Sequence, residues 1–133
     1  MEFSVEQIVQ KVVQAAHKKK ALDIRVLDIR GLSMVADYFV ICSGNSRTQV
    51  EAITEAIEEE LEQAGVSIQG LEGKEGARWV LIDLGDIVVH VFHRDDREFY
   101  QLEHLWGDAP SVEPLLEEVE RVSTHIKILP KTE

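Results

Sequence analysis

The sequence predicts one α/β (α+β) domain whose elements follow the order α, β, β, α, β, β, α, with a short C-terminal extension. A length of 133 residues with 44% hydrophobic side chains suits one continuous core. Apolar residues recur at helical spacing in three segments, and short runs of β-branched and aromatic residues lie between turn-forming glycines. We therefore expect residues 1–109 to form the domain and residues 110–133 to form an amphipathic extension.

The first two helices each begin with the residue pair of a capping box, in which a serine is followed three positions later by a glutamine. Ser4 and Gln7 predict a helix over residues 5–19. Ser46 and Gln49 predict a second helix that ends at Gly65, because glycine commonly terminates helices. Both segments are amphipathic, so each helix is expected to pack through one face.

Four strands are expected from the β-branched and aromatic runs, over residues 23–29, 38–43, 78–83 and 87–93. The second run is apolar almost throughout, which predicts a position inside the sheet. Between the last two runs, Leu84, Gly85 and Asp86 indicate a tight hairpin turn.

A third helix is predicted after the last strand, where Asp95 and Glu98 form another capping pair. The apolar residues that follow at helical spacing are Phe99, Leu102, Leu105 and Trp106. Beyond Pro110, a second apolar stripe comprises Leu115, Leu116, Val119, Val122 and Ile126. This extension either binds a separate partner or covers the domain's own sheet or a dimer mate.

The charge balance favours a basic protein surface as the partner. The chain has 14 Lys and Arg against 25 Asp and Glu, a formal charge of −11, which repels phosphate backbones and argues against direct nucleic-acid binding as the main source of affinity. No apolar run approaches the roughly 20 residues of a membrane span, and the N-terminus lacks signal-peptide features. Cys42 is the only cysteine, so no internal disulfide can form. We expect a cytoplasmic protein that binds no membrane.

Two features suggest nucleotide chemistry, and each has an ordinary structural explanation. Asp83 and Asp86 bracket the hairpin turn and would hold a magnesium ion in a cleft, but aspartates beside glycine are also normal turn residues. Metal-dependent nucleotidyl transfer would favour carboxylates two positions apart on one strand face. The segment Gly44-Asn45-Ser46-Arg47 lies where a phosphate can meet a helix N-terminus, yet any strand-to-helix turn with a serine cap looks alike.

The histidines and the cysteine do not form a convincing site. His90 and His93 lie three positions apart on a predicted strand and would point to opposite faces, so they cannot easily share a metal. A pair of Cys42 and His90 is conceivable if their strands adjoin. A cysteine within an apolar strand is more typical of an inert buried thiol. We expect no catalytic residue, no cofactor and no metal.

The aromatic residues are more informative, because three of the four Trp and Tyr residues cluster between the hairpin and the third helix. Side chains of this kind dominate protein interfaces. The residues that suggest such an interface are Trp79, Leu84, Tyr100 and Trp106. The alternative is that they belong to the core, and for Trp106 the two interpretations weigh equally.

Two long stretches carry a more specific resemblance. Residues 28–53 (DIRGLSMVADYFVICSGNSRTQVEAI) and 72–106 (EGKEGARWVLIDLGDIVVHVFHRDDREFYQLEHLW) closely resemble the Iojap family, whose bacterial members are called ribosomal silencing factor, RsfS. The resemblance covers about residues 3–107. Asp95 and Asp96 stand where the family pattern has glutamates, and the segment after Pro110 appears as an extension that the pattern does not define.

The resemblance implies a mixed four- to five-stranded sheet with flanking helices, similar to nucleotidyltransferases but without their catalytic carboxylates. It also implies a homodimer that binds the large ribosomal subunit through ribosomal protein fourteen, blocks association with the small subunit and represses translation under nutrient limitation. The family's binding surface falls, by position, on Trp79, Leu84, Tyr100, Asp83, Gly85, Asp86 and Arg97. The alternative function is a nucleotide-binding or nucleotidyltransferase-type enzyme that uses Gly44, Ser46, Asp83 and Asp86.

Overall fold

The computed structural model describes residues 3–30 and 36–96. Its elements are α1 (Val5–Lys18), β1 (Leu22–Asp28), β2 (Tyr38–Gly44), α2 (Arg47–Gln63), β3 (Gly70–Glu72), β4 (Trp79–Asp83) and β5 (Ile87–His93). Residues 94–96 are helical and are the last ones described. The predicted third helix, the extension, Arg97 and Tyr100 lie outside the described residues.

Both helices begin at their predicted caps. The Ser4 side chain accepts from the backbone N–H of Gln7, and the Gln7 side chain accepts in return from the N–H of Ser4. The second box forms only in part. Ser46 accepts from the N–H of Gln49, but the Gln49 side chain accepts from Asn45 instead of Ser46.

The predicted role of Asp95 as a helix cap is wrong. The backbone N–H of Asp95 donates to Nδ1 of His93 over 3.2 Å, and the helical turn already begins at residue 94. A side-chain acceptor that receives the N–H two residues on is the arrangement of an N-cap. His93 therefore takes the capping position, because strand β5 ends there and places its ring beside the first turn.

The five strands form one mixed sheet in the order β1-β2-β5-β4-β3. Strands β2 and β5 are parallel and the other neighbours are antiparallel, which confirms the mixed sheet. Strand β2 has a neighbour on each side, as its apolar run predicts. The short edge strand β3 was not among the expected strands. Its three residues are held to β4 by backbone pairing and are largely exposed, so no hydrophobic pattern marks them.

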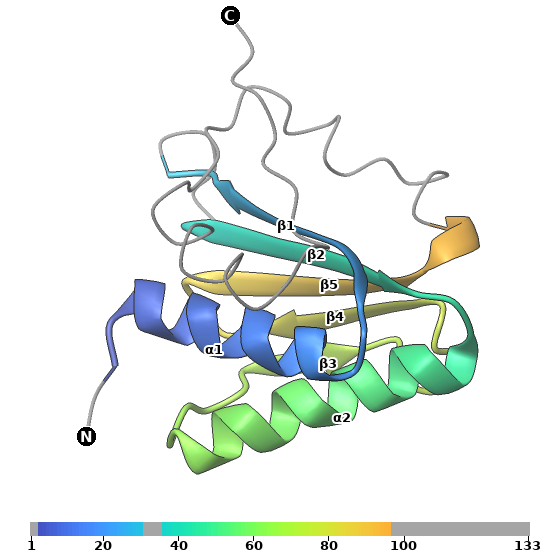
Figure 1. Cartoon of the computed structure of the whole chain (residues 1–133). Coiled ribbons are helices and arrows are strands. Elements are labelled where there is room, and N and C mark those ends of the chain that lie inside the picture. The colour runs from blue at the N-terminus through green and yellow to red at the C-terminus, as the bar shows by residue number, and fades with distance from the viewer. Residues whose placement is uncertain (1–2, 31–35, 97–133) are drawn as a thin grey trace, which may run out of the picture.

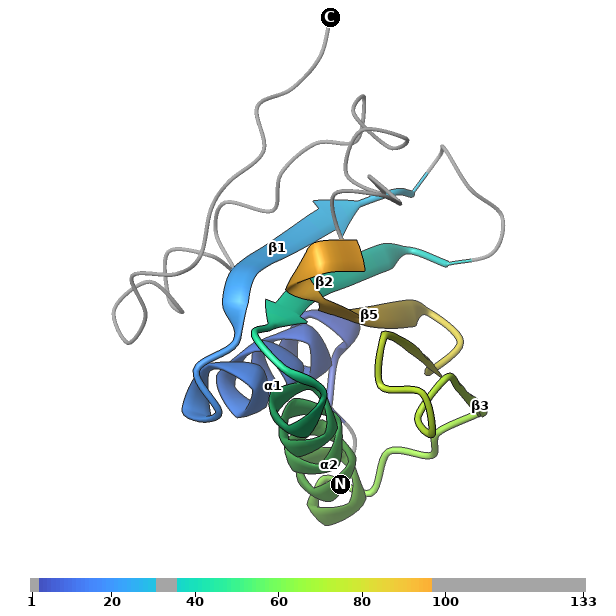
Figure 2. The same ribbon diagram turned by 90° about the vertical axis from the view of Figure 1, so that its right-hand side faces the viewer.

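Helices α1 and α2 cover the same face of the sheet (Figures 1 and 2). Their inner sides and the sheet residues that point toward them form the main core, called here the helix-side cluster. Its fully buried members include Val12, Val13, Val40, Ile53, Ile57, Leu61, Val89 and Val91. No helix among the described residues is long and apolar enough to cross a membrane.

The opposite face of the sheet, called here the helix-free face because neither α1 nor α2 lies on it, is also apolar. Its buried members are Leu27, Ile29, Ala36, Ile41, Val88 and Phe92, and the partly buried Phe39, Trp79 and Leu81 pack against them. Burial is thus incomplete along β4 and at Phe39 of β2. The helix-free face therefore presents apolar side chains at its β4 side.

Candidate functional site

The β4–β5 hairpin brings Trp79, Leu81 and Asp83 onto the helix-free face. Because side chains alternate along a strand, these residues share one side of β4. The register pairs Trp79 with Phe92, Leu81 with His90 and Asp83 with Val88. An aromatic and polar strip thus extends from β4 across β5 to Phe39 of β2, and we call it the Trp79 strip. It comprises Phe39, Trp79, Leu81, Asp83, His90 and Phe92.

Trp79 is held on two sides while it remains half-buried. Its ring stacks on Phe92 with the centroids 5.1 Å apart and the planes inclined by 26°. Its Nε1–H donates to Nδ1 of His90 over 3.0 Å. Both contacts come from β5, the neighbouring strand, so the indole has a fixed direction relative to the sheet.

His90 is the most polar of the buried members of this strip and is only 4% exposed. The Phe39 ring meets it edge-on at 4.8 Å. Burial lowers the pKa of His90 from 6.5 to about 4, so the ring is neutral near pH 7. Since Nδ1 accepts from Trp79, the single proton of the neutral ring is on Nε2. Nε2 has no hydrogen-bond partner among residues 3–30 and 36–96.

The hairpin tip has the turn chemistry that its sequence predicts. The N–H of Leu84 donates to the carbonyl of Ile87 over 2.9 Å, and Gly85 has a φ of 91°, which favours glycine. Oδ1 of Asp83 accepts from the N–H of Gly85 over 2.8 Å. Asp86 is exposed, while its carbonyl accepts from Asp37. Both carboxylates therefore lie at the tip, with Asp83 stabilising the turn.

Leu84, a candidate interface residue, does not project from the hairpin tip. It is half-buried and packs against the helix-side cluster. The structure therefore brings Trp79 and Asp83 together on one face and directs Leu84 to the other side. A partner that contacts all three residues would have to reach around the hairpin tip.

The residues of the nucleotide alternative are not assembled into one pocket. Gly44 pairs with His93 at one end of β5, and Asp83 pairs with Val88 near the other end. The five steps from Val88 to His93 span roughly 16 Å along the strand. The N–H of Asn45 is already bonded to the Gln49 side chain, which removes one of the amides that a phosphate would need.

The other candidate chemistry is separated by the sheet itself. Cys42 belongs to the helix-side cluster, whereas His90 faces the opposite side, so they cannot act as a nucleophile pair. His90 and His93 also point to opposite faces, as the strand alternation predicts. Within residues 3–30 and 36–96, no group of three or more His, Cys, Asp or Glu side chains is placed to hold a metal ion.

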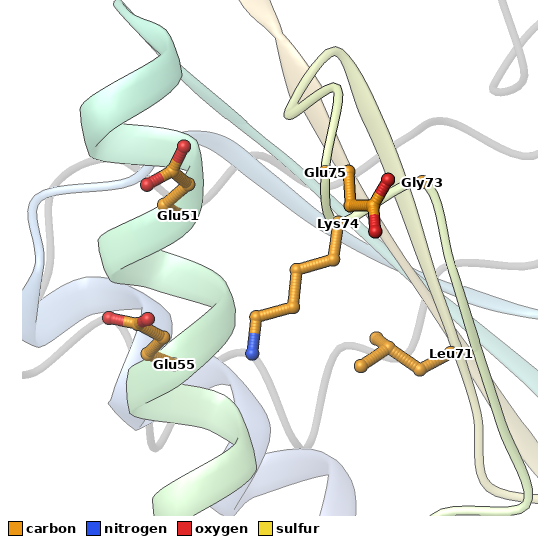
Figure 3. Close-up of a pocket in the computed structure, with 6 residues that line it drawn as sticks. All are labelled: Glu51, Glu55, Leu71, Gly73, Lys74 and Glu75. Atoms are coloured by element: carbon orange, nitrogen blue, oxygen red, sulfur yellow. The ribbon is translucent and has the colours of Figure 1, made fainter.

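A cavity of about 610 Å³ lies between α2 and the loop after β3 (Figure 3). The carboxylates of Glu51, Glu55 and Glu75 line it. The Lys74 side chain extends toward α2, where its Nζ is 2.8 Å from Oε1 of Glu58. The excess of carboxylates makes this cavity repel anionic ligands such as nucleotides.

Comparison with known proteins decides the family. The family model described as "Ribosomal silencing factor during starvation" matches residues 2–130. The chain belongs to this family. The RsfS match thus extends well beyond residues 3–107. We expected the segment after Pro110 to lie outside the family pattern, but the family model includes it as far as residue 130.

Individual relatives of the RsfS family agree with this assignment. A "Ribosomal silencing factor RsfS" from Halalkalibacterium halodurans is 52% identical over 84% of this chain and 95% of its own length. A protein of the same name from Bacillus subtilis is 51% identical over 79% of this chain and 89% of its own. A crystal structure from Chromobacterium violaceum has a TM-score of 0.77 at 36% identity and covers 79% of this chain and 88% of that chain.

A more distant relative is the mouse "Mitochondrial assembly of ribosomal large subunit protein 1". It is 30% identical over 74% of this chain and 44% of its own length. The agreement with the Chromobacterium violaceum crystal structure shows that the described fold, a five-stranded mixed sheet with flanking helices, is the fold of this family.

Proposed function

We propose that this chain is a ribosomal silencing factor. In this proposal it binds the large ribosomal subunit through ribosomal protein fourteen, blocks association with the small subunit and represses translation when nutrients are scarce. The names of the bacterial relatives and of the family support the silencing role. The name of the mouse relative refers to the large ribosomal subunit, which supports that subunit as the partner.

The structural observation that carries the proposal is the half-buried, doubly held indole of Trp79 beside the acidic hairpin tip. An aromatic side chain with a fixed direction loses little entropy when it binds, and such residues carry much of the energy of protein interfaces. Asp83 and Asp86 would meet Lys or Arg side chains of a basic ribosomal protein. Gly85, Leu84, Arg97 and Tyr100 complete the proposed surface.

The proposed mechanism is steric and involves no enzymatic step. A domain of this length has a radius of gyration near 14 Å. Bound at a subunit interface, it occupies space that the small subunit must enter. The proposal further includes a homodimer in the free state and a cytoplasmic location. Sedimentation of the purified protein at micromolar concentration would test the dimer.

The proposal is tested by cosedimentation with separated ribosomal subunits, followed by a subunit-joining assay. We expect binding to the large subunit alone and fewer joined ribosomes. Trp79→Ala should weaken this binding by about 2 kcal/mol or more, roughly thirtyfold, because it removes an interface anchor. Leu71→Ala is the matched control, since Leu71 is 36% exposed and lies on the α2 side of the sheet, where it lines the cavity beside Glu51 and Glu55. Unchanged binding by folded Trp79→Ala would remove Trp79 from the surface.

A further inference from the structure

We propose that His90 is a positioning residue of the partner-binding surface. Its Nδ1 atom fixes the indole of Trp79 in the orientation in which Trp79 contacts the partner. The inference rests on the proposed function, because it assigns a role within that surface.

The two residues are diagonal neighbours across the hairpin. Trp79 pairs with Phe92 and Leu81 pairs with His90, so the rings of Trp79 and His90 lie on the same face two positions out of register. His90 is buried and Trp79 is half-buried. The buried acceptor, Nδ1 of His90, is therefore the fixed partner. It holds the Nε1–H group of the more exposed Trp79 ring.

Packing alone does not explain a histidine at this position. Among the described residues, the rings next to His90 are those of Phe39, Trp79 and Phe92, and Nε2 has no hydrogen-bond partner there. A buried donor without a partner is unfavourable, and a phenylalanine would fill a ring-sized site without one. The contribution that a phenylalanine cannot make is acceptance of the Trp79 N–H.

Loss of this acceptor would affect binding more than folding. Without Nδ1, the indole N–H of Trp79 would turn toward water, because its half-buried ring can reach solvent. The protein would then have to restore the ring orientation whenever it bound its partner, which lowers affinity.

Three substitutions of His90 separate its role as hydrogen-bond acceptor for Trp79 from its role in packing. His90→Asn places an amide oxygen near the position of Nδ1, so it should restore the bond to Trp79. His90→Gln places its amide near Nε2, and His90→Phe keeps only the ring. We expect His90→Phe and His90→Gln to bind the large subunit about tenfold more weakly, which corresponds to about 1.4 kcal/mol. His90→Asn should recover most of the lost affinity.

A double-mutant cycle tests whether His90 acts through Trp79. In a Trp79→Phe background, which has no indole N–H, His90→Phe should cause no further loss of affinity. Equal losses in the two backgrounds would overturn the inference. His17→Gln on α1 serves as a control histidine, since it lies away from the Trp79 strip and should leave affinity unchanged.

The indole N–H resonance gives a readout that does not need the ribosome. The chain has two tryptophans, and Trp79→Phe identifies the resonance of Trp79. This proton should exchange slowly with water in the wild type and in His90→Asn, and rapidly in His90→Phe. Equally slow exchange in His90→Phe would overturn the inference even with intact ribosome binding. Failure of the wild type to bind either subunit would instead overturn the proposed function, whatever the exchange rate.

Discussion

At the scale of single residues, the protonation of His90 links the Trp79 strip to the stability of the fold. The ring is surrounded by aromatic side chains, and burial is the cause of its lowered pKa of about 4. An unfolded chain would have an ordinary histidine pKa near 6.5. Between these two values the unfolded state binds the proton and the folded state does not.

Folding stability should therefore fall as the pH decreases from about 6.5 to about 4, and this contribution should level off below that range. The full effect is about 3 kcal/mol, from the free energy of one pKa unit. Urea unfolding of the wild type and of His90→Phe across this range checks the prediction. The variant should lose this part of the pH dependence, and identical slopes would contradict it.

Gly73 provides a second residue-scale prediction, because it closes the loop that leads into Trp79. It has a φ of 81°, and an added Cβ would lie 2.0 Å from the carbonyl oxygen of Trp79. Gly73→Ala should destabilise the fold by about 2 kcal/mol or more, since both the backbone and the contact are unfavourable. In Gly76→Ala the nearest atom would be 4.0 Å away, so this matched variant should be nearly neutral in thermal denaturation.

At the scale of elements, Gln49 connects the two helices. Its Nε2 donates to the carbonyls of Lys19 and Lys20 at the C-terminal end of α1, and its Oε1 accepts from Asn45 before α2. One side chain thus satisfies backbone groups at the ends of both helices, groups that otherwise lack partners within a helix.

Gln49→Ala should lower the free energy of unfolding by about 1–2 kcal/mol, because each lost hydrogen bond leaves a backbone group to find water. Gln63→Ala removes the same side chain at the far end of α2, where its bond to Glu59 is long at 3.4 Å and exposed. Chemical denaturation should show little change for that variant. Equal losses of unfolding free energy in the two variants would show that Gln49 does not connect the helices in this way.

The elements also show what the sequence could predict. The serine caps and the apolar runs located both helices and four strands to within one or two residues, because these signals are local. Strand β3 is stabilised by pairing with β4 and leaves no local pattern. The contact between His90 and Trp79 could have been inferred from the hairpin: once Leu84 and Ile87 close the turn, the register places position 90 opposite Leu81 and so diagonal to Trp79 on the same face. The direction of the Leu84 side chain depends on tertiary packing, so it could not be inferred from the sequence.

At the scale of the whole molecule, the burial of the helix-free face bears on the role of the extension, residues 110–133. Leu27, Ile41 and Phe92 on this face are fully buried, although α1 and α2 both lie on the other side (Figure 2). The family match continues to residue 130, so the extension belongs to the RsfS pattern. We predict that its apolar stripe packs on the domain itself instead of binding a separate partner, and truncation distinguishes these two interpretations.

Removal of residues 111–133 should therefore lower the unfolding free energy and increase the binding of a hydrophobic dye, because apolar surface becomes exposed. A matched pair in the full chain sharpens the test. Leu116→Ser with Val119→Ser interrupts the apolar stripe, whereas Glu117→Ser with Glu120→Ser changes polar positions of the same segment. The first pair should reproduce the effect of truncation and the second should not. Unchanged stability of the truncated chain, together with weaker binding to the large subunit, would instead assign the extension to the partner, since its apolar positions would then be available for docking.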